Sequence, residues 1–208
     1  MQIYVINGPD GIGKTDFSVS LAENLKDSNK VLLIQGERNA TSNIEDYFNK
    51  DGMITYDIAD YFTELAPLSM VVINQYDNLD FIISPLLEDK YEIKSEDIKK
   101  LLSNVSYDYV ILNGVDKNLL SDKYVIDIVG ENDLSYVSDS DAFFINRVSD
   151  DYDVRKYKDQ IDSKSSKFLG TVKEGEYFQE IIENIENNNT VEVAKIGFFE
   201  RLRSGFRK

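Results

Sequence analysis

Short apolar runs alternate along the chain with segments in which apolar residues recur at helical spacing. The first run, residues 3–7, is rich in Ile, Val and Tyr and predicts a β-strand. A helix is predicted over residues 15–27, because Phe17, Leu21 and Leu25 follow one another at intervals of four. Further strands are predicted over residues 31–35, 71–74, 79–83, 109–113, 124–129, 142–148 and 168–172. Further helices are predicted over residues 58–65, 95–102 (with Ser95 as N-cap), 153–161 and 176–186, with one helical turn at 44–48.

This alternation of strands and helices is typical of an α/β protein. Strands that are apolar throughout belong in a sheet covered on both faces, which is the usual setting of parallel strands. We therefore predict a three-layer α/β fold with a mainly parallel sheet and helices on both faces. The Asn-rich stretch at residues 187–190 breaks the pattern, so we expect a globular domain over residues 1–190 and a separate C-terminal segment over residues 191–208.

Composition and charge exclude several classes of function. The chain of 208 residues carries 38 acidic and 23 basic side chains, a net charge of −15, so it would repel phosphates and we expect no nucleic-acid partner. It contains neither Cys nor His, which excludes disulfides, thiolate catalysis, Ser-His-Asp triads and His-ligated metals. The first residues lack the pattern of a signal peptide, and no run reaches the roughly 18 apolar residues of a transmembrane helix, so we expect a cytoplasmic protein.

Residues 8–15 read GPDGIGKT and match the phosphate-binding pattern G-x-x-x-x-G-K-[ST], between a predicted strand and a predicted helix. Gly11 and Gly13 let the backbone curl so that its N–H groups point at phosphate oxygens, beside the positive end of the following helix. Lys14 can reach the β- and γ-phosphates, and the Thr15 hydroxyl can ligate Mg²⁺. The alternative is a glycine-rich turn that holds no ligand. The residues predicted to contact nucleotide here are Gly8, Gly11, Ile12, Gly13, Lys14, Thr15 and Asp16.

With this loop in place, the chain resembles the MinD/ParA group of P-loop ATPases over nearly its whole length, and the MinD-like branch in particular. The resemblance implies a three-layer P-loop NTPase fold that binds ATP or ADP together with Mg²⁺. It places Asn146 and Arg147 beside the adenine, where Asn146 would hydrogen-bond the base through its amide. Alternatively, Asn146 merely caps the end of a strand. The segments that carry the resemblance are residues 30–34 (second strand), 78–85 (a strand that ends in proline), 107–113 (the Walker B strand) and 143–148 (a late strand with an Asn-Arg pair).

The P-loop departs from the family pattern at two positions. Pro9 stands where the family carries a signature lysine that reaches across a dimer to the partner's phosphates. Asp10 stands where a glycine is usual, and a carboxylate near a triphosphate costs free energy unless it points away. The resemblance implies a homodimer, and the loss of the lysine leaves two alternatives, dimerisation controlled by nucleotide and constitutive association.

Two further departures concern hydrolysis. Gln35 stands where the family carries an aspartate that orients or activates water, and Asn113 replaces the Walker B aspartate that holds Mg²⁺ through water. An amide can accept a hydrogen bond from a metal-bound water but brings no charge to offset Mg²⁺. Asp116 and Glu37 are candidate substitutes. Because phosphate binding depends mostly on the P-loop itself, whereas hydrolysis needs a placed water and a well-held metal, we predict nucleotide binding with weak or absent hydrolysis.

The last residues, 195–208, hold five basic side chains and one acid, a net charge of +4, so the rest of the chain carries −19. Wound as a helix, the segment has an apolar stripe flanked by basic residues, the pattern of a helix that lies in a bilayer interface. MinD-like proteins are similar in ending with such a helix, which binds membrane when nucleotide drives dimerisation. The alternatives are packing on the protein's own acidic surface and a disordered tail. The residues predicted to contact the membrane are Ile196, Phe198, Phe199, Arg201, Leu202, Arg203 and Phe206.

These features support the hypothesis of a MinD/ParA-like, nucleotide-binding protein that acts as a membrane-associated positioning or scaffold factor. The implied partners are a second copy of the chain, the inner membrane face and a protein of pilus, secretion or division machinery, as in degenerate CpaE- or TadZ-like relatives. Two alternatives belong to other classes. One is a small P-loop kinase or ligase, which would need an acceptor site and a carboxylate base, and the other is a pseudo-ATPase that binds no nucleotide and serves as an interaction module.

Overall fold

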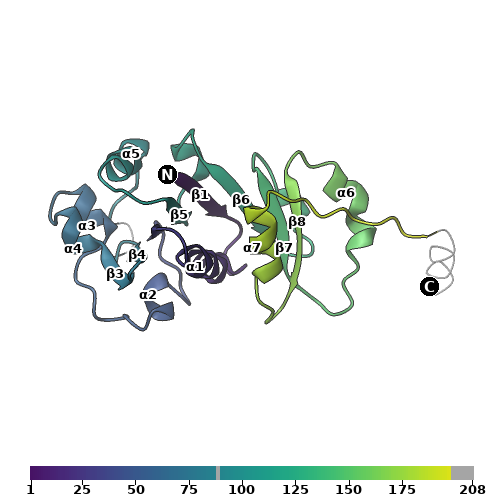
Figure 1. Ribbon diagram of the computed structural model, residues 1–208, viewed down its shortest axis with the longest axis horizontal. Helices are drawn as coiled ribbons and strands as arrows, with labels where there is room; N and C mark the ends of the chain where they lie inside the picture. Colours follow the sequence, from purple (N-terminus) through teal and green to yellow (C-terminus); the bar gives the residue numbers. More distant parts are fainter. Residues whose placement is uncertain (88–89, 198–208) are drawn as a thin grey trace.

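The computed structural model describes residues 1–87 and 90–197, which form an eight-stranded sheet with helices packed on its faces (Figure 1). The strand order is β3-β4-β2-β5-β1-β6-β7-β8, and every neighbouring pair is parallel except β3 and β4. The α/β class and the mainly parallel sheet predicted from the sequence are therefore confirmed. The strands are β1 (Gln2–Asn7), β2 (Val31–Gln35), β3 (Ile73–Tyr76), β4 (Leu79–Ile82), β5 (Tyr109–Asn113), β6 (Tyr124–Val129), β7 (Ala142–Val148) and β8 (Lys167–Lys173).

Two groups of helices cover the two faces of the sheet. Side chains of α1, α2 and α7 pack into one core cluster, and side chains of α3, α4 and α5 pack into a second. The α-helices are α1 (Lys14–Leu25), α2 (Ile44–Tyr47), α3 (Ile58–Phe62), α4 (Leu68–Val71), α5 (Ser95–Ser103), α6 (Lys158–Asp162) and α7 (Gln179–Glu186). Short 3-10 helices are η1 (Lys117–Leu119), η2 (Leu134–Tyr136) and η3 (Val154–Tyr157).

The central strands are buried on both faces, which explains why their sequences are apolar throughout. In β1, Tyr4 and Ile6 belong to the first core cluster, whereas Val5 belongs to the second, because successive side chains of a strand point to opposite faces. All five residues of β2 are buried. A third core cluster lies beside β7 and β8, where the rings of Phe143 and Phe168 are 5.3 Å apart between centroids.

Two predicted elements differ from those in the structure. The strand predicted over residues 71–74 begins later, because the short helix α4, with Pro67 at its N-cap, takes in Val71 before β3 starts. Proline is common at helix starts because its missing N–H is one of the donors left unpaired there. The single helix predicted over residues 153–161 is divided into η3 and α6.

The start of α5 also differs from the prediction. Lys94 occupies the N-cap, so the prediction of Ser95 as N-cap is wrong by one position. Ser95 is the first helical residue, and its hydroxyl donates a hydrogen bond to the carbonyl oxygen of Leu119 at 2.6 Å. The serine therefore joins α5 to η1 rather than capping its own helix.

The middle of the sheet is the place where the fold favours a ligand site. Strands β2, β3, β4 and β5 lie on one side of β1, and strands β6, β7 and β8 lie on the other. The side on which the chain adds its next strand therefore changes at β1. In open parallel sheets, ligands bind beyond the carboxyl ends of the strands at such a point. At that edge, the backbone N–H of Gly36, after β2, donates to the carbonyl of Asn113, the last residue of β5, at 2.8 Å. The loop that leaves β1 begins at the same edge of the sheet.

After α7 the chain runs back along β8 and on toward α6 (Figure 1). The backbone N–H of Val191 donates to the carbonyl of Phe168 at 2.7 Å, and Val193 is buried in the third core cluster. The division of the chain at residue 190 stays a prediction. None of the helices in the described ranges has the length and apolar composition needed to cross a bilayer. Of the predicted membrane-contacting residues, Ile196 is described, whereas Phe198, Phe199, Arg201, Leu202, Arg203 and Phe206 lie outside the described residues.

Candidate functional site

Residues 8–13 form a tight loop between β1 and α1, and two of its glycines are required by their surroundings. A Cβ on Gly8 would lie 2.4 Å from the carbonyl oxygen of Ile128 in β6. Gly13 is the N-cap of α1 with φ 96°, a left-handed conformation that side chains disfavour. A Cβ at Gly13 would also lie 2.8 Å from Nδ2 of Asn146. Gly8 is thus needed where the end of β1 approaches β6, and Gly13 where α1 approaches β7.

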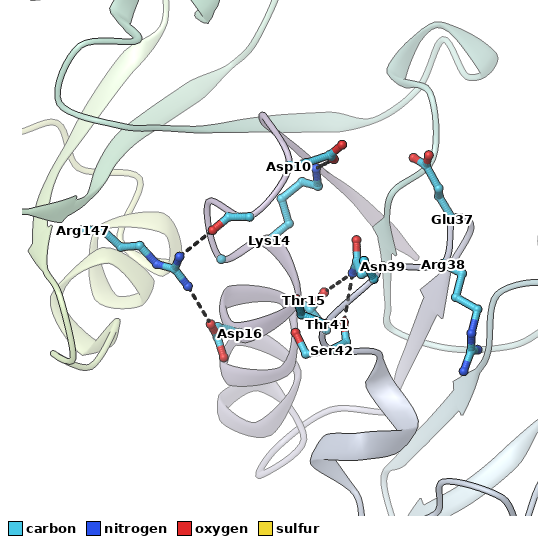
Figure 2. Close-up of a pocket in the computed structure, with 13 residues that line it drawn as sticks. Asp10, Lys14, Thr15, Asp16, Glu37, Arg38, Asn39, Thr41, Ser42 and Arg147 are labelled. Atoms are coloured by element: carbon cyan, nitrogen blue, oxygen red, sulfur yellow. Dashed lines mark hydrogen bonds and ion pairs between the residues drawn. The ribbon is translucent and has the colours of Figure 1, made fainter.

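The Lys14 side chain folds back over the loop instead of extending into solvent. Its Nζ donates to the carbonyl oxygens of Gly8 at 2.7 Å and Pro9 at 3.2 Å. It also lies 3.2 Å from Oδ1 of Asp10, and Figure 2 shows these two side chains meeting at one end of the site. The Lys14 side chain is 11% exposed and the Asp10 side chain 96% exposed, so the carboxylate can swing away while the ammonium stays. The loop therefore holds one ammonium group where a phosphate chain would lie.

The Thr15 hydroxyl is the meeting point of three segments. It accepts hydrogen bonds from Nδ2 of Asn39, after β2, at 2.8 Å and from Nδ2 of Asn113, at the end of β5, at 3.2 Å (Figure 2 shows the first). The Oδ1 atom of Asn113 is buried and has no hydrogen-bond partner among the described residues. A buried amide oxygen without a partner costs free energy, so this atom marks a place for a donor such as a bound water.

These groups also decide how well the site suits Mg²⁺. A threonine hydroxyl and an amide oxygen are hard oxygen donors but carry no charge, and Mg²⁺ usually also takes carboxylates and substrate phosphates. Glu37 lines the same cavity, whereas Asp116 accepts hydrogen bonds from the backbone and side chain of Asn118 and caps η1. No group of three or more acidic residues suited to a metal occurs in the described part of the chain. The residues present therefore fit a Mg²⁺ ion that is shared with phosphate oxygens.

Gln35, at the end of β2, is occupied by structural hydrogen bonds. Its side chain is fully buried, and Nε2 donates to the carbonyl of Glu37 at 2.8 Å and to Oδ1 of Asn43 at 2.7 Å. Its Oε1 accepts from the backbone N–H of Ile44 at 2.9 Å. The amide therefore joins the loop after β2 to the start of α2, and both of its ends are engaged by protein groups.

Asn146 and Arg147, at the end of β7, hold the P-loop from the other side. Nδ2 of Asn146 donates to the carbonyl of Ile12 at 2.7 Å, and Nη1 of Arg147 donates to the carbonyl of Gly11 at 2.5 Å. Nη2 of Arg147 lies 3.8 Å from Oδ2 of Asp16 (Figure 2). The structure thus brings together all the residues predicted to contact nucleotide, while the contact of Asn146 with a base stays a prediction.

Two further contacts fix the loop between β2 and α2. Nη1 of Arg38 lies 2.8 Å from Oε1 of Glu45, whose side chain is 3% exposed. The hydroxyl of Tyr47 donates to Asp16 in the first turn of α1. Burial, together with the hydrogen bond to Asp16, raises the pKa of Tyr47 to about 12. Tyr47 therefore stays a neutral donor, and α2 is held against α1.

A cavity of about 810 Å³ opens over these groups. Its charged residues are balanced, with three acids facing three bases: Asp10, Asp16 and Glu37, and Lys14, Arg38 and Arg147. The sequence prediction missed one wall of the cavity, which the loop after β2 supplies. The sequence feature that indicates this wall is the polar stretch directly after β2, since the loops after parallel strands meet at one edge of the sheet. The missed residues are Arg38, Asn39, Ala40, Thr41 and Ser42.

No protein-family model and no curated protein sequence matches the chain. Among solved structures, the chain is similar to a plasmid partition protein from Borrelia burgdorferi at 23% identity and TM-score 0.70, covering 90% of this chain and 98% of that one. It is similar to a putative plasmid partition protein from Borrelia burgdorferi B31, bound to AMPPNP, at 23% identity and TM-score 0.66, covering 89% and 95%. It is also similar to the septum site-determining protein MinD from Pyrococcus horikoshii OT3, complexed with Mg-ADP, at 19% identity and TM-score 0.68, covering 87% and 84%.

At these identities the likeness establishes the fold. The chain has the fold of MinD/ParA-type P-loop ATPases, as its sequence predicted, and the likeness extends over about nine-tenths of its length. Activity, partners and location are separate questions, and they depend on the residues of this chain.

Proposed function

We propose that the chain binds ATP or ADP together with Mg²⁺ at the P-loop. The observation that carries the proposal is the loop of residues 8–13, which places the Lys14 ammonium and the Thr15 hydroxyl at the edge of the 810 Å³ cavity. Lys14 would leave its carbonyl partners for the β- and γ-phosphates, and Thr15 with Asn113 would hold Mg²⁺, directly and through water. Two of the similar structures contain AMPPNP and Mg-ADP, which supports this choice of ligand.

Adenine recognition is proposed for the far end of the site. Asn146 and Arg147 already lie against the P-loop carbonyls of Ile12 and Gly11. A base bound beside them would be within reach of the amide of Asn146, which can both donate and accept hydrogen bonds.

Hydrolysis by this site is proposed to be weak or absent. Fast phosphoryl transfer needs a positioned water and positive charge around the transition state. The amide of Gln35 is committed to the loop after β2, and Asn113 offers Mg²⁺ no negative charge. The chain has Pro9 where a further lysine would add positive charge. A nucleotide could thus bind for long periods and act as a structural ligand.

Titration calorimetry of the intact chain with ATP and ADP, each with and without Mg²⁺, tests this proposal. We expect one nucleotide to bind per chain, more tightly with Mg²⁺, because the hydroxyl and amide oxygens suit a metal shared with phosphate. In a radiolabelled assay we expect turnover below about 0.01 s⁻¹, whereas enzymes typically reach 1 s⁻¹ or more. Turnover above 1 s⁻¹ would contradict the proposed weak hydrolysis, and an absence of binding heat for every nucleotide would favour an interaction module.

We further propose that the chain is a peripheral membrane protein on the cytoplasmic face and acts there as a positioning or scaffold factor in a homodimer. Residues 195–208 carry a charge of +4 and an apolar stripe, which suits the surface of an anionic membrane. One short helix binds only marginally, and two copies held in a dimer would bind far more tightly. The similar structures include a plasmid partition protein and a septum site-determining protein, which are named for positional tasks.

Vesicle flotation with two matched variants tests the membrane proposal. Leu202→Asp places a charge on the apolar stripe, and Ser204→Asp places the same charge off the stripe. We expect Leu202→Asp to lower vesicle binding by more than about thirtyfold, because it removes a buried apolar group and adds a charge, and Ser204→Asp by about fivefold. Equal losses for the two variants would show that charge alone, and no apolar stripe, determines binding.

A further inference from the structure

A groove of about 550 Å³ lies beside η3 and α6 and is also lined by residues 195 and 196. Figure 1 shows the chain after α7 running past α6. The groove is far from the nucleotide cavity and shares no residue with it. The groove takes residues from η3, from α6 and from the chain after Val193. The lining residues are Arg155, Lys156, Lys158, Asp159, Lys195 and Ile196.

Two of the cations in this groove are positioned by neighbouring acids. Nε of Arg155 lies 2.8 Å from Oδ1 of Asp153, and Nη2 lies 3.0 Å from Oδ2, so the pair is bidentate. The hydrogen bond from Arg155 lowers the pKa of Asp153 below its usual value. Nζ of Lys158 lies 2.8 Å from Oδ2 of Asp162, one turn along α6. These pairs restrict the positions of the two side chains in the groove lining.

The other two cations, Lys156 and Lys195, are exposed, and neither forms an ion pair with another residue in the described ranges. Among the described residues, the groove lining carries four bases and one acid, and this part of the lining stays positive when Asp153 and Asp162 are included. This excess occurs on a chain of net charge −15, whose nucleotide cavity has equal numbers of acids and bases. A local positive field of this kind attracts an anion at short range.

We propose that this groove binds the phosphate-bearing headgroup of an anionic lipid, so that the globular body contacts the membrane together with the tail. The proposal rests on the membrane association proposed above. Val193 is fixed in the third core cluster, and Lys195 and Ile196, which line the groove, are also the first residues of the basic segment 195–208. The groove and the predicted membrane-binding segment are therefore continuous.

The negative charge of the globular body explains why a contact between the groove and the membrane would be needed to orient the bound protein. The chain before residue 195 carries −19, so an anionic leaflet repels most of the body. A tail alone would leave the body free to turn away from the membrane. A headgroup held by Lys156 and Lys195 would place the η3–α6 side against the leaflet and so fix the orientation of the bound protein.

The test uses the full chain and three variants on vesicles with an increasing fraction of phosphatidylglycerol. Lys156→Gln removes one charge and Lys156→Glu reverses it, while Lys99→Glu makes the same reversal on α5, at an exposed site away from the groove. We expect vesicle affinity to fall about fivefold for Lys156→Gln and about thirtyfold for Lys156→Glu, with less than a twofold change for Lys99→Glu. Urea unfolding should be unchanged in all three, since these side chains are exposed.

The outcomes separate this inference from the proposed function. If Lys156→Glu binds vesicles like Lys99→Glu while Leu202→Asp fails to bind, the tail acts alone and the groove inference is overturned. If wild type shows no affinity for the vesicles, both proposals fail. Calorimetry with inorganic phosphate covers the other source of the same chemistry. If Lys156→Glu abolishes phosphate binding but leaves vesicle binding intact, the groove binds a free phosphate and the lipid assignment is overturned.

Discussion

Replacing Lys14 with alanine is expected to lower the affinity of the chain for ATP and ADP by about 100-fold or more, with little change in stability. The ammonium is the single positive charge among residues 8–15, and charge-assisted hydrogen bonds are about twice as strong as neutral ones. Losing two or more such bonds corresponds to about 3 kcal/mol, or a little over two factors of ten in the dissociation constant. The backbone amides of the loop would remain, so weak binding should persist at high nucleotide concentration.

The fold of the nucleotide-free protein should tolerate Lys14→Ala, because of the groups that Lys14 contacts when no nucleotide is bound. Its Nζ contacts two uncharged backbone carbonyls, those of Gly8 and Pro9, and the carboxylate of Asp10, which is 96% exposed. No buried charge is left unpaired, so the free energy of unfolding should change by less than about 1 kcal/mol.

Asp10→Asn is the companion variant, and it should act in the opposite direction. The carboxylate of Asp10 competes with phosphate for the ammonium of Lys14 and adds a like charge near the triphosphate. Because an exposed pair is worth up to about 1 kcal/mol, affinity should rise by up to about fivefold.

Lys30→Ala, at an exposed site before β2, is the charge-matched control for Lys14→Ala. Calorimetry decides: equal affinities for Lys14→Ala and Lys30→Ala would show that nucleotide does not bind at this loop.

Apart from Asn113, Asn146 and Arg147, which the family resemblance implied, the part of the site that the sequence predicted is built from neighbouring residues. The P-loop is contiguous, so the spacing of its glycines and Lys14 is visible in the sequence, although contacts with β6 and β7 are what require Gly8 and Gly13. The central strands can also be predicted from the sequence, because burial on both faces makes each of them an unbroken apolar run. Both features leave a contiguous pattern of residues, which a single sequence displays directly.

The remainder depends on contacts between distant residues, which a single sequence does not display. Asn39 reaches the Thr15 hydroxyl across 24 positions, and Gln35 is bound by α2. The sequence indicates that Gln35 replaces a catalytic aspartate. The structure adds that its amide holds the loop after β2 against α2 through hydrogen bonds. The error at Ser95 has the same cause, since its hydroxyl bonds the carbonyl of Leu119 on another segment.

Replacing Asp57 with alanine is expected to destabilise the fold by about 3–5 kcal/mol, a large fraction of the 5–15 kcal/mol that holds a typical domain together. Asp57 is fully buried and is the N-cap of α3, where its Oδ1 accepts from the backbone N–H groups of Ala59 at 2.8 Å and Asp60 at 3.2 Å. Its Oδ2 accepts from the N–H of Leu86 at 2.9 Å and from Nζ of Lys90 at 2.8 Å. One carboxylate thus ties α3 to the chain that follows β4.

The size of the effect follows from what the alanine variant would leave behind. Lys90 would keep Asp60 as a partner at 2.8 Å, and the backbone N–H of Asp60 would keep the carbonyl of residue 57 at 3.1 Å. The backbone N–H groups of Ala59 and Leu86 would lose their acceptor. Asp57→Asn keeps the shape and one acceptor oxygen, so it should cost about half as much. Asp51→Ala is the matched control, because Asp51 is exposed and makes no side-chain hydrogen bond with another described residue. Urea unfolding should then rank the losses as Asp57→Ala, Asp57→Asn and Asp51→Ala. If Asp57→Ala unfolds at the same urea concentration as Asp51→Ala, the contact between α3 and the chain after β4 does not stabilise the fold.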